Sequence, residues 1–364
     1  MANTPHSPAW HLIVTGLFFI LALSACAAPS YYNQAISGHM RLMNQREDVQ
    51  KILASGEADP ELLRELELSI NIRDFAVKQL GLPENNSYTQ YVGTGQSAVT
   101  WNVVAVPEFS LIPRKWCFLA SGCVPYRGYF EEAAARKFAG SLDQKGFDTT
   151  ISPAIAYSTL GWFDDPLLDT MFQYSDEQLA AFIFHELAHQ QLYIKGDTAF
   201  NEAYASFVEE AGLSRWLEAE GRTGYAATRK AAEKASLQLN ALLQSTRNEL
   251  AHLYAGEASE QEMRAEKFAI FVQLRENYQE LVDTQWGGKY YYISIASGDL
   301  NNASLTLINT YQGGACAFEI LFRKAGSDIL KFHQEAAVKA RLGKEARGNW
   351  LNQPCGDIAS NSDM

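Results

Sequence analysis

The chain has 364 residues and a formal net charge of −12, and 47% of its residues are hydrophobic. This hydrophobic content is sufficient for a large folded core, which excludes intrinsic disorder as the default class. An acidic chain with no stripe of basic residues also argues against nucleic acid as a partner.

The first 25 residues are typical of an export signal. Residues 12–23 form an apolar run of about a dozen residues, which suits a signal peptide and is shorter than a membrane-spanning helix. The run ends in the letters LSAC, which resemble a bacterial lipobox whose cysteine, Cys26, is acylated and begins the mature protein. This resemblance implies a lipid anchor in the membrane, and Ala27 favours the outer membrane with the chain facing the periplasm. An ordinary signal peptide with an incidental cysteine is the alternative.

The first half of the mature chain mixes helices with strands. Residues 27–80 are predicted to be helical, and Gly81-Leu82-Pro83 ends the last helix. Residues 88–125 have β-branched and aromatic residues between glycine and proline breaks, which predicts strands. A helix is predicted over residues 128–148, and a strand in the segment ISPAIAYSTLGWF, residues 151–163.

The second half is predicted to be mostly helical. Two helices within residues 213–282 join near Gly256 and form a long antiparallel hairpin. A few strand-like residues at 289–296 and one or two helices up to about residue 342 follow. The predicted fold class is α+β, predominantly helical, with a small mixed sheet and the long helical hairpin.

This pattern divides the chain without an evident linker between autonomous domains. Residues 1–25 are the lipoprotein signal peptide, and residues 26–212 contain the N-terminal helix, the sheet and the candidate active site. Residues 213–364 contain the hairpin and the C-terminal helices. We expect the last two parts to pack as one catalytic unit.

Four cysteines remain once Cys26 is assigned to the anchor. An even number in an exported chain suggests disulfides, and Cys117 and Cys123 could close a short loop. Cys316 and Cys355 are the other candidates, and free buried thiols are the alternative for either pair. A zinc ribbon would need a second close pair of cysteines, which the chain lacks.

The segment SDEQLAAFIFHELAHQ contains the pattern HExxH on a predicted helix. Ser175, with Gln178 three residues later, forms a capping box at the helix start. His185 and His189 then lie one turn apart on one face, as zinc ligands do, and Glu186 lies about 100° round the helix. Glu186 is therefore placed as the general base for a zinc-activated water.

A catalytic zinc ion needs a third protein ligand and an open position. A second helix predicted from Thr198 carries Glu202 and Glu209. If that helix runs back alongside the first, at about 1.5 Å per residue, Glu202 returns to the level of the histidines and Glu209 overshoots it. Glu202 is the predicted ligand, with Glu209 as the alternative. A metzincin is excluded because its third histidine would fall at Lys195.

The two helices together resemble a known family. HELAHQ followed by FNEAYASFVE is similar to the motif pair of the zinc aminopeptidases of the gluzincin clan, in which the glutamate after asparagine binds the metal. The resemblance maps that ligand onto Glu202 and matches Asp197 to an aspartate outside the ligand set. The interval between His189 and Glu202 is 12 residues, shorter than in those enzymes.

The resemblance extends over nearly the whole mature chain. AYSTLGWFDDPLL and YRGYF are further markers of the bacterial family of putative aminopeptidases, predicted zinc-dependent lipoproteins. The family implies a zincin-like metallopeptidase with one zinc ion per chain. Gluzincins commonly stabilise the oxyanion with a tyrosine or histidine, and Tyr157 and Tyr311 are candidates, with structural roles as the alternative. Asp164 and Asp165 could bind a substrate amine, although a surface loop is the simpler interpretation.

The combined prediction is a membrane-anchored zinc metallopeptidase that hydrolyses peptides or proteins, with Glu186 as general base and aminopeptidase action implied by the family. The alternative is a non-catalytic, zinc-stabilised envelope scaffold or chaperone. A purely structural zinc site has no use for a base beside the metal, so Glu186 favours the enzyme.

Overall fold

The computed structural model describes residues 27–118, 122–156, 163–222, 225–310 and 315–353. The chain forms two compact units, which divide between Gln45 and Arg46. The described part of the first unit is dominated by helix α2 (Ala27–Asn44). All further description concerns the second unit, and the predicted boundary at residues 212 and 213 stays a prediction.

Two helices lie near the start of the second unit, and the second of them ends where its sequence predicts. They are α3 (Val49–Ser55) and the longer α4 (Pro60–Leu80). The side chain of Asp59 caps α4, and Pro60 occupies its first position, where a missing N–H is tolerated. Gly81 ends α4 in the left-handed conformation, with φ of 66°.

The strands form small separate sheets. One is a mixed three-stranded sheet in the order β1 (Glu47–Asp48), β2 (Gln90–Val92) and β8 (Leu167–Leu168). The second is an antiparallel sheet in the order β6 (Tyr126–Tyr129), β3 (Thr100–Pro107) and β7 (Phe147–Ala154). The third is the ribbon of β4 (Trp116–Phe118) and β5 (Gly122–Val124). The prediction of one mixed sheet is therefore only partly correct.

The predicted boundaries around the antiparallel sheet are also partly wrong. The helix expected over residues 128–148 is the shorter α5 (Glu132–Asp143). Both of its predicted ends are instead taken by strands, because β6 and β7 pair with the two edges of β3. Residues 289–296 are not a strand, because the last four of them belong to α10 (Ile293–Ser297). Just before this helix, Tyr291 and Tyr292 pack against the hydrophobic core of the helical hairpin.

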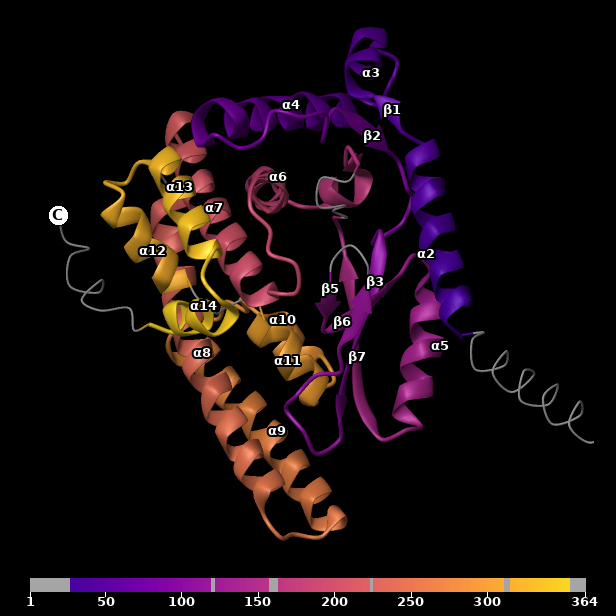
Figure 1. Cartoon of the computed structure of the whole chain (residues 1–364), viewed down its shortest axis with the longest axis vertical. Coiled ribbons are helices and arrows are strands. Elements are labelled where there is room, and N and C mark those ends of the chain that lie inside the picture. The colour runs from indigo at the N-terminus through magenta and orange to yellow at the C-terminus, as the bar shows by residue number, and fades with distance from the viewer. Residues whose placement is uncertain (1–26, 119–121, 157–162, 223–224, 311–314, 354–364) are drawn as a thin grey trace, which may run out of the picture. The chain divides into compact units, whose positions relative to one another are not determined.

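Figure 1 shows the long helical hairpin of the prediction, formed by α8 (Tyr225–Ala255) and α9 (Glu260–Thr284). Ser259 and Glu262 form a capping box at the start of α9. Buried residues of both helices, including Leu243 and Tyr278, give the hairpin its own core. The other helices of the unit are α6 (Asp176–Gln191), α7 (Thr198–Ala219), α11 (Asn302–Thr310), α12 (Ala315–Lys324), α13 (Ile329–Ala340), α14 (Lys344–Leu351) and the short 3-10 helix η1 (Asp169–Gln173).

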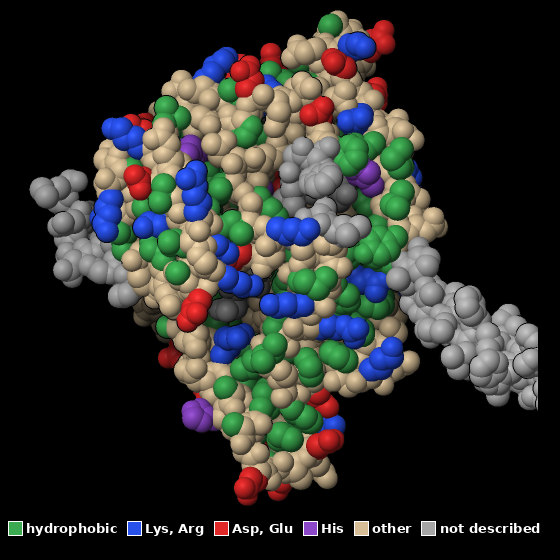
Figure 2. Space-filling view, viewed as in Figure 1, with side chains coloured by type: hydrophobic (Ala, Val, Ile, Leu, Met, Phe, Trp, Pro, Cys, Tyr) green, Lys and Arg blue, Asp and Glu red, His purple; other side chains and the backbone are tan. Residues whose placement is uncertain are grey.

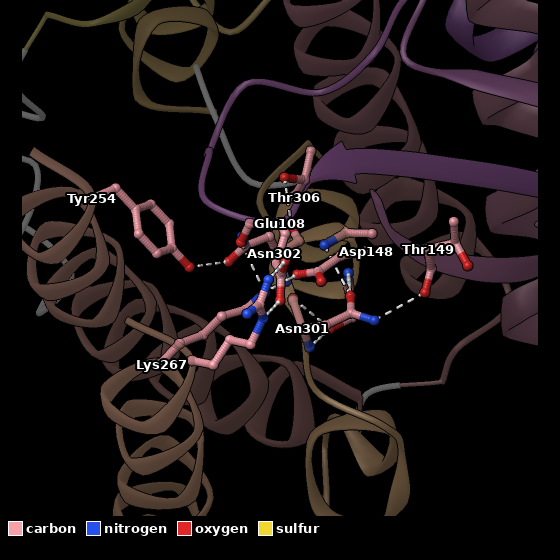
Figure 3. Close-up of polar contacts among 11 residues, drawn as sticks. Glu108, Asp148, Thr149, Tyr254, Lys267, Asn301, Asn302 and Thr306 are labelled. Atoms are coloured by element: carbon pink, nitrogen blue, oxygen red, sulfur yellow. Dashed lines mark hydrogen bonds and ion pairs between the residues drawn. The ribbon is translucent and has the colours of Figure 1, made fainter. Parts of the chain in front are cut away.

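A buried polar cluster holds the hairpin against the antiparallel sheet (Figure 3). The ammonium group of Lys267 in α9 donates to Asp148 of β7 at 2.6 Å and to the carbonyl of Glu108 at 2.9 Å. Asn302 at the start of α11 donates to the same two residues and accepts from the hydroxyl of Tyr254 in α8. Each of these contacts pairs a donor with an acceptor, so we assign the cluster a structural role.

The cysteines agree in part with the prediction. Cys117 and Cys123 form a disulfide across the β4–β5 ribbon. Cys316 is also disulfide-bonded. Cys26 and Cys355 both lie outside the described residues. In the part of the chain that is described, no helix combines the length and the hydropathy needed to cross a bilayer.

Candidate metal centre

Helix α6 presents both histidines as the sequence predicts. Its capping box is complete, since the Ser175 hydroxyl accepts from the backbone of Gln178 and the Gln178 side chain accepts from the backbone of Ser175. Leu179, Ile183 and Leu187 are buried on the core side of the helix. This burial leaves the histidine face of α6 turned toward α7, with which α6 packs directly (Figure 1).

The turn between α6 and α7 sends the second helix back along the first. The Asn201 side chain accepts from the N–H of Ile194 at 2.8 Å and donates to its carbonyl at 2.9 Å, which closes the turn. Further along, Gly212 lets the helices approach, because a Cβ there would lie 2.6 Å from Leu80 and 3.0 Å from Phe184. The reversal brings Glu202 to the histidines.

Three side chains converge on one point. The Nε2 atoms of His185 and His189 lie 3.1 Å apart. The Glu202 carboxylate oxygens lie 3.4 Å from Nε2 of His185 and 3.7 Å from Nε2 of His189. Two ligands of a tetrahedral zinc ion, each bound at about 2.0–2.1 Å, lie about 3.3 Å apart. The spacing and the chemistry of this donor set therefore fit a zinc ion, and together these residues form a group that could hold a metal.

Glu209 lies on the other side of the His185 ring. Its carboxylate accepts a hydrogen bond from Nδ1 of His185 at 2.8 Å. A carboxylate that binds one ring nitrogen of a histidine orients the other nitrogen toward a metal. Glu209, considered from the sequence as an alternative ligand, thus contacts the nitrogen that faces away from Glu202.

The electrostatics of the cluster separate the two histidines. Burial lowers the pKa of His185, but hydrogen bonds to Glu202 and Glu209 outweigh it and hold that pKa well above its usual value. Burial and the charge of His185 lower the pKa of His189 to about 4. Burial raises the pKa of Glu202, and its contacts with the two histidines bring it below the usual value. His189 is thus neutral and Glu202 is ionised where the donors meet, and His185 must release a proton before it can bind a cation there.

The start of α7 is held by a buried ion pair. Asp197 accepts from the backbone of Phe200, which caps the helix, and from the guanidinium of Arg347 in α14 at 2.7 and 2.8 Å. The side chains of Asp197 and Arg347 are 10% and 9% exposed. Asp197, matched to the family by resemblance, therefore anchors the helix that carries Glu202.

A second network covers the face of α6 next to the histidines. Gln190 accepts from Asn85 at 2.7 Å and donates to Ser87 and to Asp165, at 3.2 Å each. Asp165 is 1% exposed, so the interpretation as a surface loop is wrong for this residue. It is buried because the segment before β8 packs against the loop that follows α4.

The structure adds a tyrosine to the candidates for the oxyanion donor. Tyr157 and Tyr311 lie outside the described residues. Tyr193, four residues after His189, has its ring 6.2 Å from the His189 ring, and burial and the charge of Glu202 raise its pKa. The one-turn spacing from His189 is the signal that could have identified it in the sequence. Tyr193 is thus a tyrosine of the site that the motif analysis missed.

A basic groove lies apart from the group of His185, His189 and Glu202, between α12, α13 and α14. Its volume is about 900 Å³, and Lys324, Lys331 and Lys339 line it with Trp350. Figure 2 shows Lys and Arg side chains gathered over these helices. The described lining residues include one carboxylate, Glu335, and no histidine. The groove therefore lacks the donor set of a second zinc site.

Comparison with known proteins agrees with the family resemblance of the sequence. The family model described as Putative aminopeptidase matches residues 30–351. No match was found among curated proteins or among solved structures. The match covers both α6 and α7 and most of the chain. The chain therefore belongs to the putative aminopeptidase family.

Proposed function

We propose that this protein is a zinc-dependent, gluzincin-like peptidase. The description of its family indicates that it acts as an aminopeptidase. The observation that carries the proposal is the convergence of His185, His189 and Glu202 beside Glu186, in a chain whose family is described as aminopeptidases. The proposal includes one zinc ion per chain and a zincin-like arrangement of α6 and α7. It also retains the lipid anchor at Cys26 and an outer-membrane location facing the periplasm, which rest on the sequence of the export signal.

The residues of the site divide the chemical work. A zinc ion bound there would polarise the scissile carbonyl and lower the pKa of a water molecule. Glu186, half-buried beside the histidines, takes the proton of the attacking water and delivers it to the leaving amine. Glu209 keeps the His185 ring oriented, and the ion pair of Asp197 with Arg347 keeps α7 in place.

The site also has candidates for the remaining roles. Tyr193 is close enough to Glu202 and His189 to serve as a donor to the oxyanion, alongside the sequence candidates Tyr157 and Tyr311. A peptide N-terminus would be recognised by carboxylates near the metal. Asp165 is buried beside Gln190, so a role in binding the substrate amine requires an approach through the loop that covers it.

The test compares the full chain, purified in detergent, with its Glu186→Gln variant. We expect both proteins to bind one zinc ion and only the parent to cleave a peptide library. Loss of cleavage on acetylating the peptide N-termini would identify an aminopeptidase. Zinc binding without cleavage by the parent would favour the scaffold, and absence of zinc from both would contradict the ligand assignment.

A further inference from the structure

Tyr88 combines features that are unusual for a loop tyrosine. Its side chain is 1% exposed, and its hydroxyl has no hydrogen-bond partner among the described residues. Its backbone has φ of 62°, in the left-handed region that tyrosine seldom adopts. Buried hydroxyls are nearly always hydrogen-bonded, and strained backbone conformations cluster at functional sites. Tyr88 therefore calls for a functional explanation.

The surrounding contacts hold the strained conformation in place. The N–H of Tyr88 donates to the carbonyl of Asp165 at 2.7 Å. Arg73 of α4 donates to the carbonyl of Ser87 at 3.0 Å and to the carbonyl of Asn85. The Asn85 side chain accepts from the N–H of Ser87 at 2.9 Å. This loop, residues 85–88, is consequently tied both to α4 and to the segment before β8.

The same loop is bound to the face of α6 that carries Glu186. Glu186 and Gln190 are four residues apart on α6 and therefore share a face. Asn85 and Ser87 both hydrogen-bond Gln190, one turn beyond Glu186. Tyr88 follows directly in the chain. The contacts to Gln190 thus place Tyr88 next to the turn of α6 that bears Glu186.

The charges around the phenol agree with this placement. Burial raises the pKa of Tyr88 well above its usual value, and the charges of Glu186 and then Asp165 add to the rise. The phenol therefore remains protonated and can only donate toward a carboxylate. Asp165 already accepts a hydrogen bond from Gln190 at 3.2 Å. Glu186 is the carboxylate with the larger influence on the phenol.

We propose that Tyr88 is a positioning residue for Glu186: its phenol donates a hydrogen bond to one bridging water, which donates to the Glu186 carboxylate and holds that carboxylate toward the histidines. This inference rests on the proposed function, in which Glu186 is the base. A base must lie within hydrogen-bond reach of the proton it removes, so a fixed carboxylate increases the rate of proton transfer.

The kinetic test uses Tyr88→Phe in the full chain, because this change removes only the hydroxyl. We expect kcat to fall about 10- to 100-fold with KM within about twofold, since the lost contact acts on the base and not on substrate binding. Tyr254→Phe is the matched control, because it also deletes one hydrogen-bonding phenol but lies in the remote cluster of Figure 3. Equal kcat values for Tyr88→Phe and the parent would overturn the proposal.

A second test does not depend on activity. Unfolding of the metal-free full chain by urea is measured for Tyr88→Phe, Glu186→Ala and the double variant. We expect Tyr88→Phe to lower the folding equilibrium constant about tenfold or more in the parent and much less in the Glu186→Ala background. An equal effect in both backgrounds, or coupling to Asp165→Ala in place of Glu186→Ala, would overturn the contact.

The two tests separate this inference from the proposed function. If the parent chain binds zinc and cleaves no peptide, the proposed function fails, and the unfolding cycle still decides whether Tyr88 holds Glu186. If the parent cleaves and Glu186→Gln does not, while Tyr88→Phe has the parent kcat and shows no coupling, only the inference on Tyr88 fails.

Discussion

Glu209 accepts a hydrogen bond from Nδ1 of His185 at 2.8 Å, while Nε2 of the same ring faces Glu202. The two carboxylates of α7 thus bind opposite nitrogens of one imidazole. Glu202 and Glu209 are seven residues apart, which places them two turns apart on one helix face. Because Glu209 holds the proton at Nδ1, Nε2 is the atom of His185 that can bind a metal, once the ring releases the second proton that its raised pKa retains.

Removing the carboxylate of Glu209 should weaken metal binding without abolishing it. We expect Glu209→Ala to lower zinc affinity about 10- to 100-fold, because the His185 ring loses the partner that orients it. Affinity is measured by competition with a chromophoric chelator. The exposed neighbour Glu210 provides the control, and Glu210→Ala should bind zinc like the parent. Parent-like affinity for Glu209→Ala would contradict the orienting role.

The ion pair between Asp197 and Arg347 should contribute strongly to stability. Arg347→Met leaves a buried carboxylate without its partner, so we expect a loss of about 3–5 kcal/mol in the free energy of unfolding. The double variant Asp197→Asn, Arg347→Met should lose less than the sum of the single changes, because the isolated charge is absent. Urea unfolding measures both. The exposed Arg341, changed to Met, should shift stability by no more than about 0.5 kcal/mol. Additive losses in the double variant would refute coupling of the pair.

His333 should make stability dependent on pH. Its Nε2 donates to the carbonyl of Leu80 at 2.9 Å, so the neutral ring accepts from the hydroxyl of Tyr204 at Nδ1, 2.8 Å away. Burial lowers the pKa of His333 from 6.5, more than the bond to Leu80 raises it. Between the two pKa values the unfolded chain binds a proton that the folded chain does not. The contribution of His333 is therefore present above about pH 6.5 and is lost as the pH falls toward the folded pKa.

The measurement compares urea unfolding of the parent and His333→Gln across that pH range. His185 and His189 also titrate, so the difference between the two proteins is the informative quantity. We expect the stability advantage of the parent to shrink below about pH 6.5. Parallel pH curves for the two proteins would show that His333 does not carry this dependence.

The β4–β5 ribbon should influence the turn between the two ligand helices. A Cβ on Gly122 would lie 2.9 Å from the backbone nitrogen of Gly196 and 3.1 Å from the Lys195 side chain. We expect Gly122→Ala to lower stability by about 1 kcal/mol or more and to weaken zinc binding, because the turn must move. Gly146→Ala is a matched control: its φ of 78° resembles the 77° of Gly122, but a Cβ there meets nothing within 4 Å. Equal zinc affinity of the two variants would argue against the contact.

Local interactions explain the parts of the fold that the sequence predicted well. The capping boxes of Ser175 and Ser259, and the start of α7 at Thr198, depend on residues within one turn of each other. The spacing of His185 and His189 likewise follows from helical geometry alone. The lengths of α6 and α7, together with their antiparallel packing, were enough to predict that Glu202 lies near the two histidines. The disulfide of Cys117 with Cys123 closes over a separation of only 6 residues.

Contacts between distant segments determine the parts of the fold and of the site that the sequence did not predict. The ends of α5 were mispredicted because the pairing of β6 and β7 with β3 is set by strands elsewhere in the chain. Arg347 reaches Asp197 across 150 residues, and the sequence shows no pattern that links them. Gln190 meets Ser87 across 103 residues in the same way.

The helix that presents two histidines and a glutamate on adjacent faces could therefore be predicted from the sequence, because hydrogen bonds within one turn define a helix. The side chains that surround that helix could be identified from the tertiary structure alone. The partner of His185 at Nδ1, the anchor of Asp197 and the burial of the Tyr88 phenol all come from packing. Such contacts depend on how segments far apart in the chain pack into a common core, and the spacing of residues in the sequence does not predict that packing.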